Sequence, residues 1–206
     1  MIVTISRLYD SYDDAKRAVQ GLEAAGVPHS DISIVANNSD NWYTTGQKVD
    51  RDRDGVDDRA ESAGKGAGIG AGLGGAAGLL AGLGLLAIPG LGPVVAAGWL
   101  ASTAVGAAAG AATGGIVGAL TEAGISKEDA SLYAEGVRRG GTLVSARISE
   151  TDRARLDSIL NRSSVNLRER STAWQKSGWK GFDPASEPYG AEQVREERQL
   201  YGAGMR

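Results

Sequence analysis

Residues 50–61 carry carboxylates and a glycine at the spacing of a calcium-binding loop. The pattern D-x-D-x-D-G-x5-E is met by Asp50, Asp52, Asp54, Gly55 and Glu61. Oxygen ligands at alternate positions, a glycine at the sharp turn and a bidentate final Glu are what a calcium ion needs. However, Asp57 stands where such loops are usually apolar, and the preceding residues lack helical periodicity. A solvated acidic linker is therefore the favoured interpretation, and we assign no metal ligand.

Three other groups of residues suggest chemistry, and each has a simpler structural interpretation. Gly70–Gly75 matches G-x-G-x-x-G, but it follows no strand and has no acidic residue about 20 positions on, as a dinucleotide site requires. His29 is the sole histidine and lies beside Pro28 in a predicted turn, without a serine partner nearby. Arg138–Gly141 could hold an anion at a turn, but two cations and two glycines are also typical of a helix end. We therefore predict no catalytic residue, no cofactor and no small-molecule substrate.

The composition argues against several further classes of function. The chain has 206 residues, a net charge of −3 and no cysteine. The lack of cysteine excludes disulfides, thiolate metal sites and cysteine nucleophiles. Because the basic residues are scattered, we expect no nucleic-acid partner. The first ten residues lack the charged and then apolar pattern of a signal peptide, which predicts a cytoplasmic location for this part of the chain.

The longest uniform feature is a run of 56 residues without a charge, from Gly66 to Thr121. Glycines recur in it at every fourth position, which places them along one slowly drifting row of a helix and lets a second backbone approach closely. A Pro- and Gly-rich stretch at 88–93 cannot continue a helix and divides the run. These features predict a glycine-zipper helical hairpin over 62–121, with arms at 62–87 and 94–121. The predicted helix-packing residues are Gly66, Gly70, Gly74, Gly78, Gly82, Gly98, Gly106, Gly110, Gly114 and Gly118.

Two environments suit such a hairpin, and the sequence leaves both open. Each arm is long enough to cross the hydrocarbon core of a bilayer. Its Leu, Ile and Val residues contribute only about −2 to −4 kcal/mol per arm to insertion, and the glycines reduce that gain. If the hairpin inserts, both of its ends lie on the cytoplasmic side, because Lys65 precedes the run and Glu122 and Lys127 follow it. Otherwise its small-residue faces are buried in a homo-oligomer or against the protein's own sheet.

The sequence on either side of this run repeats a strand–helix–strand pattern. The expected strands are 2–5, 31–35, 142–148 and 164–168, and the expected helices between them are 11–25 and 151–160. Two such units interleave into a four-stranded antiparallel sheet backed by two helices. The sequence therefore predicts an α+β protein with a ferredoxin-like sheet.

The predicted organisation has five parts. Two halves at 1–37 and 140–170 form the ferredoxin-like domain. The remaining parts are an acidic loop at 38–61, the helical hairpin at 62–121, a connecting helix at 122–139 and an extended aromatic tail at 171–206.

Four segments spread along the chain carry a resemblance to a known family. They are LYDSYDDAKRAVQGLEAAGVPHSDISIVAN near the start, IPGLGPVVAAG and YAEGVRRGGTLV in the middle, and GWKGFDPASEPYG near the end. The first resembles the N-terminal domain of the bacterial heat-induced general stress proteins of the 17M type. The others are similar to glycine-rich members of that group, some of which are described as low-temperature-induced proteins. The resemblance covers about residues 2–170 and implies expression under stress, with no catalytic residues and no defined substrate to carry over.

These observations predict a non-enzymatic general stress-response protein that self-associates, or docks on the inner membrane, through the glycine-zipper hairpin. The expected partners are further copies of the same chain, a homo-oligomer, and membrane lipid. The alternative is a soluble ligand- or calcium-sensing module in which the hairpin packs on its own sheet and the acidic loop binds the ion.

Overall fold

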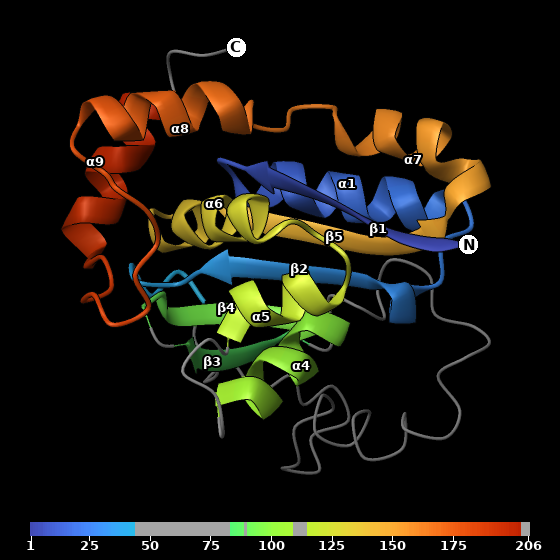
Figure 1. The fold of residues 1–206 in the computed structure, drawn as a ribbon, viewed down its shortest axis with the longest axis horizontal. Coiled ribbons are helices and arrows are strands. Elements are labelled where there is room, and N and C mark those ends of the chain that lie inside the picture. The colour runs from blue at the N-terminus through green and yellow to red at the C-terminus, as the bar shows by residue number, and fades with distance from the viewer. Residues whose placement is uncertain (44–82, 89, 109–114, 203–206) are drawn as a thin grey trace, which may run out of the picture.

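The computed structural model describes residues 1–43, 83–88, 90–108 and 115–202. The calcium-loop pattern at 50–61 lies outside these residues, and so do seven of the ten predicted helix-packing glycines. Those seven are Gly66, Gly70, Gly74, Gly78, Gly82, Gly110 and Gly114. The described part is an α+β structure built around one antiparallel sheet (Figure 1).

Five strands of the described residues form this sheet in the order β1-β5-β2-β4-β3, and every neighbouring pair is antiparallel. Their bounds are β1 Ile2–Tyr9, β2 Ile32–Asn37, β3 Gly84–Ile88, β4 Gly92–Gly98 and β5 Thr142–Ser149. Because β5 pairs with both β1 and β2, these two strands run parallel to each other, and helix α1 (Tyr12–Ala24) joins them. The sequence predictions for β1, β2, β5 and α1 are confirmed.

Helix α1 forms for the reasons that its sequence indicates. The Ser11 hydroxyl accepts a hydrogen bond from the Asp14 backbone N–H at 3.1 Å and caps the first turn. Asp13 and Asp14 lie in that turn, where the helix dipole favours negative charge. The buried stripe of the helix consists of Ala15, Ala18, Val19 and Leu22.

The predicted strand at 164–168 is wrong. The Val165 N–H donates to the Leu8 carbonyl of β1 at 2.8 Å, and the chain then turns into helix α8 (Leu167–Lys176). Asn166 caps α8, and the helix buries Arg170 and Trp174, which lie four residues apart on one face. Arg170 and Trp174 would also share one face in a strand. The charged and polar residues around them favour a helix with a single buried stripe instead.

The predicted helical arms are wrong for residues 84–87 and 94–98, which lie in the antiparallel strands β3 and β4, whereas the chain does reverse within the predicted break at 88–93. Gly90 (φ +75°) and Gly92 (φ +81°) adopt left-handed backbone conformations in the turn between the two strands. The Leu and Val residues of this stretch fit a half-buried sheet, where β4 also pairs with β2. The sheet therefore has five strands instead of the predicted four.

Helix α4 (Trp99–Ala108) follows β4 without a loop, and the junction depends on Gly98. Gly98 has φ +86°, and a Cβ atom there would collide with the Ile32 carbonyl of β2. The close approach lets the Ser33 hydroxyl accept a hydrogen bond from the Leu100 N–H at 2.8 Å, which caps α4 from the neighbouring strand. Helix α5 (Gly115–Glu122) packs beside α4.

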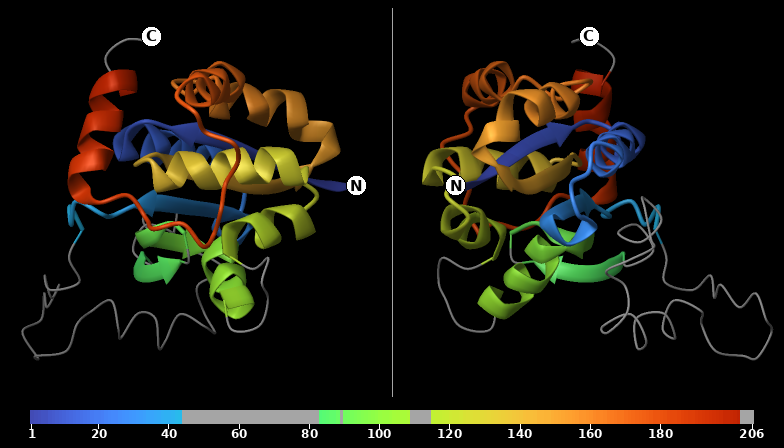
Figure 2. Two further views of the ribbon diagram at one scale, coloured as in Figure 1. Left: turned by 60° about the vertical axis from the view of Figure 1, so that its left-hand side comes forward. Right: turned by 90° about the vertical axis from the view of Figure 1, so that its right-hand side faces the viewer.

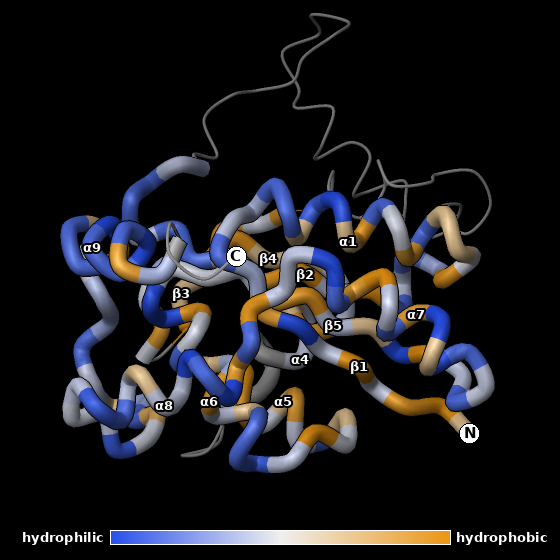
Figure 3. The backbone as a smooth tube through the Cα atoms, turned by 90° about the horizontal axis from the view of Figure 1, so that it is seen from above, coloured by the Kyte–Doolittle hydropathy of each residue, from blue (hydrophilic) through white to orange (hydrophobic). Residues whose placement is uncertain are grey.

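Helices cover both faces of the sheet (Figure 2). Helices α1 and α7 (Arg153–Leu160) bury one face, with the core residues Ile5, Val19, Leu22, Ile34, Val144 and Leu156. Helices α4, α5 and α6 (Lys127–Arg138) bury the other, with Leu8, Val35, Leu100, Leu120, Val137 and Leu143. Figure 3 shows apolar residues along the strands in the middle, and hydrophilic residues recurring along surrounding helices such as α8 and α9. The described residues of the charge-free run are thus either strands of the sheet, β3 and β4, or helices packed on it, α4 and α5.

The predicted extended tail at 171–206 is wrong for residues 171–176 and 191–202 of this C-terminal region, which are helical. It contains the end of α8, an irregular segment at 177–190 and helix α9 (Ala191–Gly202). We call residues 177–190 the C-terminal strap. The strap covers the β3–β4 turn: a Cβ atom on Gly90 would lie 2.8 Å from Cα of Pro184, and one on Gly92 would lie 2.7 Å from Cβ of Pro188.

Within the described ranges, each helix is too short or too polar to traverse a lipid bilayer.

Candidate functional site

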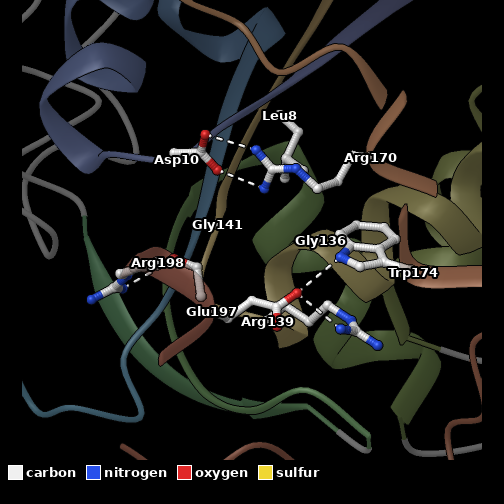
Figure 4. Close-up of a pocket in the computed structure, with 10 residues that line it drawn as sticks. Leu8, Asp10, Gly136, Arg139, Gly141, Arg170, Trp174, Glu197 and Arg198 are labelled. Carbon is white, nitrogen blue, oxygen red and sulfur yellow. Dashed lines mark hydrogen bonds and ion pairs between the residues drawn. The ribbon is translucent and has the colours of Figure 1, made fainter. Parts of the chain in front are cut away.

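The densest group of charged side chains lies where β1 and α6 end and where α8 and α9 meet them (Figure 4). We call it the arginine cluster: Arg138, Arg139, Arg170 and Arg198 with the carboxylates of Asp10, Asp40, Glu135 and Glu197. Five of its members, Asp10, Arg139, Arg170, Glu197 and Arg198, line a cavity of about 10 Å³, which is room for one water molecule. The cavity is therefore too small to hold a substrate.

Glycines at the end of α6 let the surrounding elements approach the cluster. Gly140 (φ +104°) follows the helix, and a Cβ atom on it would lie 2.6 Å from Cγ1 of Val194 in α9. A Cβ atom on Gly136 would collide with the Leu8 side chain of β1. The glycines that the sequence showed at this helix end therefore allow close packing as well as a change of chain direction.

Arg139 is the centre of the cluster. Its Nε atom donates to Glu135 Oε1 at 2.6 Å and one terminal nitrogen donates to Glu197 Oε1 at 2.9 Å. The same Glu197 oxygen accepts the indole N–H of Trp174 at 2.9 Å, and the guanidinium lies 5.0 Å from the centre of the Trp174 ring. Burial opposes the charge on Arg139, but the hydrogen bonds to Glu197 and Glu135 outweigh it and raise its pKa.

Glu135 has no exposed side-chain surface and forms ion pairs with two arginines. Besides the bond to Arg139, Oε2 lies 3.4 Å from a terminal nitrogen of Arg138. Tyr189 of the C-terminal strap stacks on both guanidiniums, at 4.9 Å from Arg138 and 5.3 Å from Arg139. A carboxylate buried in this way is stable only while its cationic partners stay in place.

The other two arginines attach α8 and α9 to the sheet. Arg170 of α8 makes two parallel hydrogen bonds of 2.9 Å to the Asp10 carboxylate, the bidentate geometry that a guanidinium prefers, and stacks on Tyr201 of α9 at 4.4 Å. Arg198 of α9 pairs with Asp40 at 2.5 Å and also donates to the Gly140 carbonyl at 3.1 and 3.0 Å. Segments from both ends of the chain therefore meet here.

The chemistry of the cluster is that of a structural junction. Each of its carboxylates already accepts hydrogen bonds from an arginine, so none is placed as a free general base. The described residues contain no group of three or more His, Cys, Asp or Glu side chains that could hold a metal ion. The anion that the sequence suggested for Arg138–Gly141 is supplied by the chain's own Glu135 and Glu197.

Three of the predicted helix-packing glycines are described, and they do not form one row. Gly98 ends β4, Gly106 lies in α4 and Gly118 lies in α5. Of the cluster, the sequence pointed only to the arginine pair at the end of α6. The signal for the rest was weak: Arg170 and Trp174 share a helical spacing in a polar segment, and the C-terminal region is rich in aromatic residues.

A second surface of different character lies at the far edge of the sheet. The described residues of β3, β4, α4 and α5 up to Thr121 contain no charged side chain, and we call this part the uncharged end. Its outermost strand is β3, in which the Leu85 side chain is 40% exposed.

The comparisons with known proteins give no match. No family model, no curated protein and no solved structure is similar to this chain. A functional proposal for the chain therefore depends on its own residues.

Proposed function

We propose that this chain is a non-enzymatic stress-response protein that works by associating with copies of itself through its uncharged end. The observation that carries the proposal is the unequal distribution of charge over the fold. The described part of the charge-free run forms the last two strands at one edge of the sheet, β4 and β3, together with α4 and most of α5. A surface without charges loses little solvation when a second copy covers it, and it brings no like charges together.

The arginine cluster supports the non-enzymatic part of the proposal. Its charged groups are paired with each other, and its cavity has room for one water molecule. The side chains that most resemble a binding site are thus used to hold α8 and α9 in place. The stress-response part of the proposal comes from the resemblance to the 17M-type proteins.

Docking on a membrane through the helical hairpin has less support. Residues 84–87 and 94–98, which would supply parts of both arms, lie in strands of the sheet. Helices α4 and α5 place their apolar residues against the same sheet, including Leu100, Ile116 and Leu120. Both features use apolar surface inside the protein that a membrane anchor would present to lipid.

The proposal is tested by measuring the molar mass of the purified chain by light scattering over a range of concentrations, in 0.15 M and 1 M NaCl. We expect an oligomer that persists in 1 M salt, because association through an uncharged surface is not screened. A monomer at all concentrations would contradict the proposal. An oligomer that dissociates in high salt would show that charged surfaces hold it together instead. The amount of this protein in its native host should also rise after a heat or cold shock.

A further inference from the structure

The outer edge of β3 is an open edge of the sheet in the described part of the chain. β3 pairs with β4 along its inner side, and the described residues place no strand along its outer side. Backbone N–H and C=O groups along such an edge are directed outward and are free to pair with another strand. This edge is therefore a template for strand addition.

The two edges of the sheet differ in how they are protected. β1, the other edge strand, carries Arg7, and its Leu8 carbonyl accepts a backbone hydrogen bond from Val165, which lies outside the sheet. Charged side chains and covering segments are the usual means of preventing edge-to-edge pairing. β3 has the sequence GLLAI. It contains neither a charged residue nor a proline, the two residue types that commonly prevent pairing at an edge strand.

We propose that β3 pairs antiparallel with β3 of a second copy, which joins the two sheets into one. The inference rests on the self-association proposed above and names its surface and register. A two-fold axis at Leu86 places Leu86 opposite its own copy and Leu85 opposite Ala87 of the second copy. A second copy is the partner that fits, because an antiparallel strand is complementary to itself and this one brings no like charges together.

The side chains of β3 also match this arrangement. Leu86 is half-buried and packs at the margin of the core beneath α4, α5 and α6. Leu85 is on the opposite face of the strand and is 40% exposed. Pairing with a second copy continues both faces across the new boundary, so the exposed part of Leu85 becomes covered.

The first test replaces Leu85 with lysine. Leu85→Lys places one charge from each copy on the same face of the joined sheet, two positions apart along the strands, and a lysine on an edge strand discourages pairing. We expect the dissociation constant of the dimer to rise at least about tenfold, measured by analytical ultracentrifugation. The matched control is Leu200→Lys, because Leu200 is 71% exposed on α9 and its replacement leaves β3 unchanged.

The second test introduces single cysteines into the chain, which has none of its own. In the proposed register, Leu86→Cys brings two thiols directly opposite each other, where strand separation suits a disulfide, and mild oxidation should yield a covalent dimer. Leu85→Cys should cross-link poorly, because its two copies are diagonal neighbours about 7–8 Å apart. Combining Leu85→Cys with Ala87→Cys should restore efficient cross-linking.

The outcomes separate this inference from the broader proposal. If the wild-type chain is monomeric, both fail, including the case in which another part of the same chain covers β3. If the chain associates but Leu85→Lys has no more effect than Leu200→Lys, self-association stands and the β3 interface is wrong. If Leu85→Cys cross-links as well as Leu86→Cys, the proposed register is wrong.

Discussion

The arginine cluster and the uncharged end lie around the same sheet but differ in how they are packed: the first by paired charges, the second without charged side chains. In the cluster, arginine and carboxylate side chains pair with one another, and Arg139 and Trp174 share one Glu197 oxygen. At the uncharged end, glycine, alanine and a few aliphatic side chains form the packing, and β3 pairs with β4 along its inner side. The polar part of the molecule thus holds the chain together internally, and the apolar part is where we propose that copies associate.

Breaking the cluster at its buried carboxylate should have the largest effect on stability. Glu135→Gln removes the carboxylate that pairs with Arg138 and one of the two carboxylates that pair with Arg139. Removing one partner of a buried charge pair costs about 3–5 kcal/mol, because the remaining charge stays desolvated. Urea unfolding measures this loss, with Glu192→Gln on the exposed surface of α9 as the control. A loss below about 1 kcal/mol for Glu135→Gln would show that the cluster contributes little to stability.

Breaking the uncharged end at its tightest backbone approach should have the next largest effect. Gly98→Ala places a Cβ atom against the Ile32 carbonyl at a left-handed φ of +86°. We expect a loss of about 2–4 kcal/mol, from backbone strain together with overpacking. Gly124→Ala is the matched control, because Gly124 has φ +91° and nothing within 4 Å of the added atom, so only the strain of about 1–2 kcal/mol applies. Equal losses for the two variants would contradict the close contact.

High pH should affect the aromatic residues that adjoin β3 more than it affects Arg139. Burial, with smaller contributions from Tyr43 and Asp13, raises the pKa of Tyr12 to about 12. Its ring lies 4.7 Å from that of Trp42, and the neighbouring Tyr43 hydroxyl donates to the Leu83 carbonyl just before β3. Because the unfolded tyrosine ionises near pH 10, its contribution to stability is fully present below pH 10 and is lost as the pH rises toward 12.

Tyr12→Phe tests this dependence. The variant should lose stability less steeply than the wild type between pH 10 and 12, as measured by urea unfolding at several pH values. Arg139 should not add to the change in this range, because its raised pKa keeps the guanidinium charged. Identical slopes for the wild type and the variant would show that Tyr12 does not titrate differently in the folded state.

The elements that alternation or capping marks clearly could be predicted from the sequence. β1, β2 and β5 have β-branched, alternating residues, and α1 and α6 have a capping serine followed by acidic residues. Residues 84–98 could not be assigned in this way, because a short apolar run with many glycines suits a helix and a buried strand equally well. Their state is decided by the edge of β2, which pairs with β4 and which no local pattern reveals.

The arginine cluster was less accessible to sequence reasoning for a related reason. Glu135, Arg170 and Glu197 come from three helices, and their pairing depends on how those helices pack together. The arginine pair at the end of α6 was visible as a candidate anion site. That the anions would come from the same chain could be seen only in three dimensions.

The strap that rests on the β3–β4 turn has a consequence for biosynthesis. Pro184 and Pro188 lie against Gly90 and Gly92, so this turn is covered by residues that leave the ribosome long after the turn itself. During translation the hairpin is therefore exposed after its own strands have been made, until the strap has emerged as well. A nascent chain that stalls before Phe182 would present this apolar hairpin to chaperones and to other nascent chains.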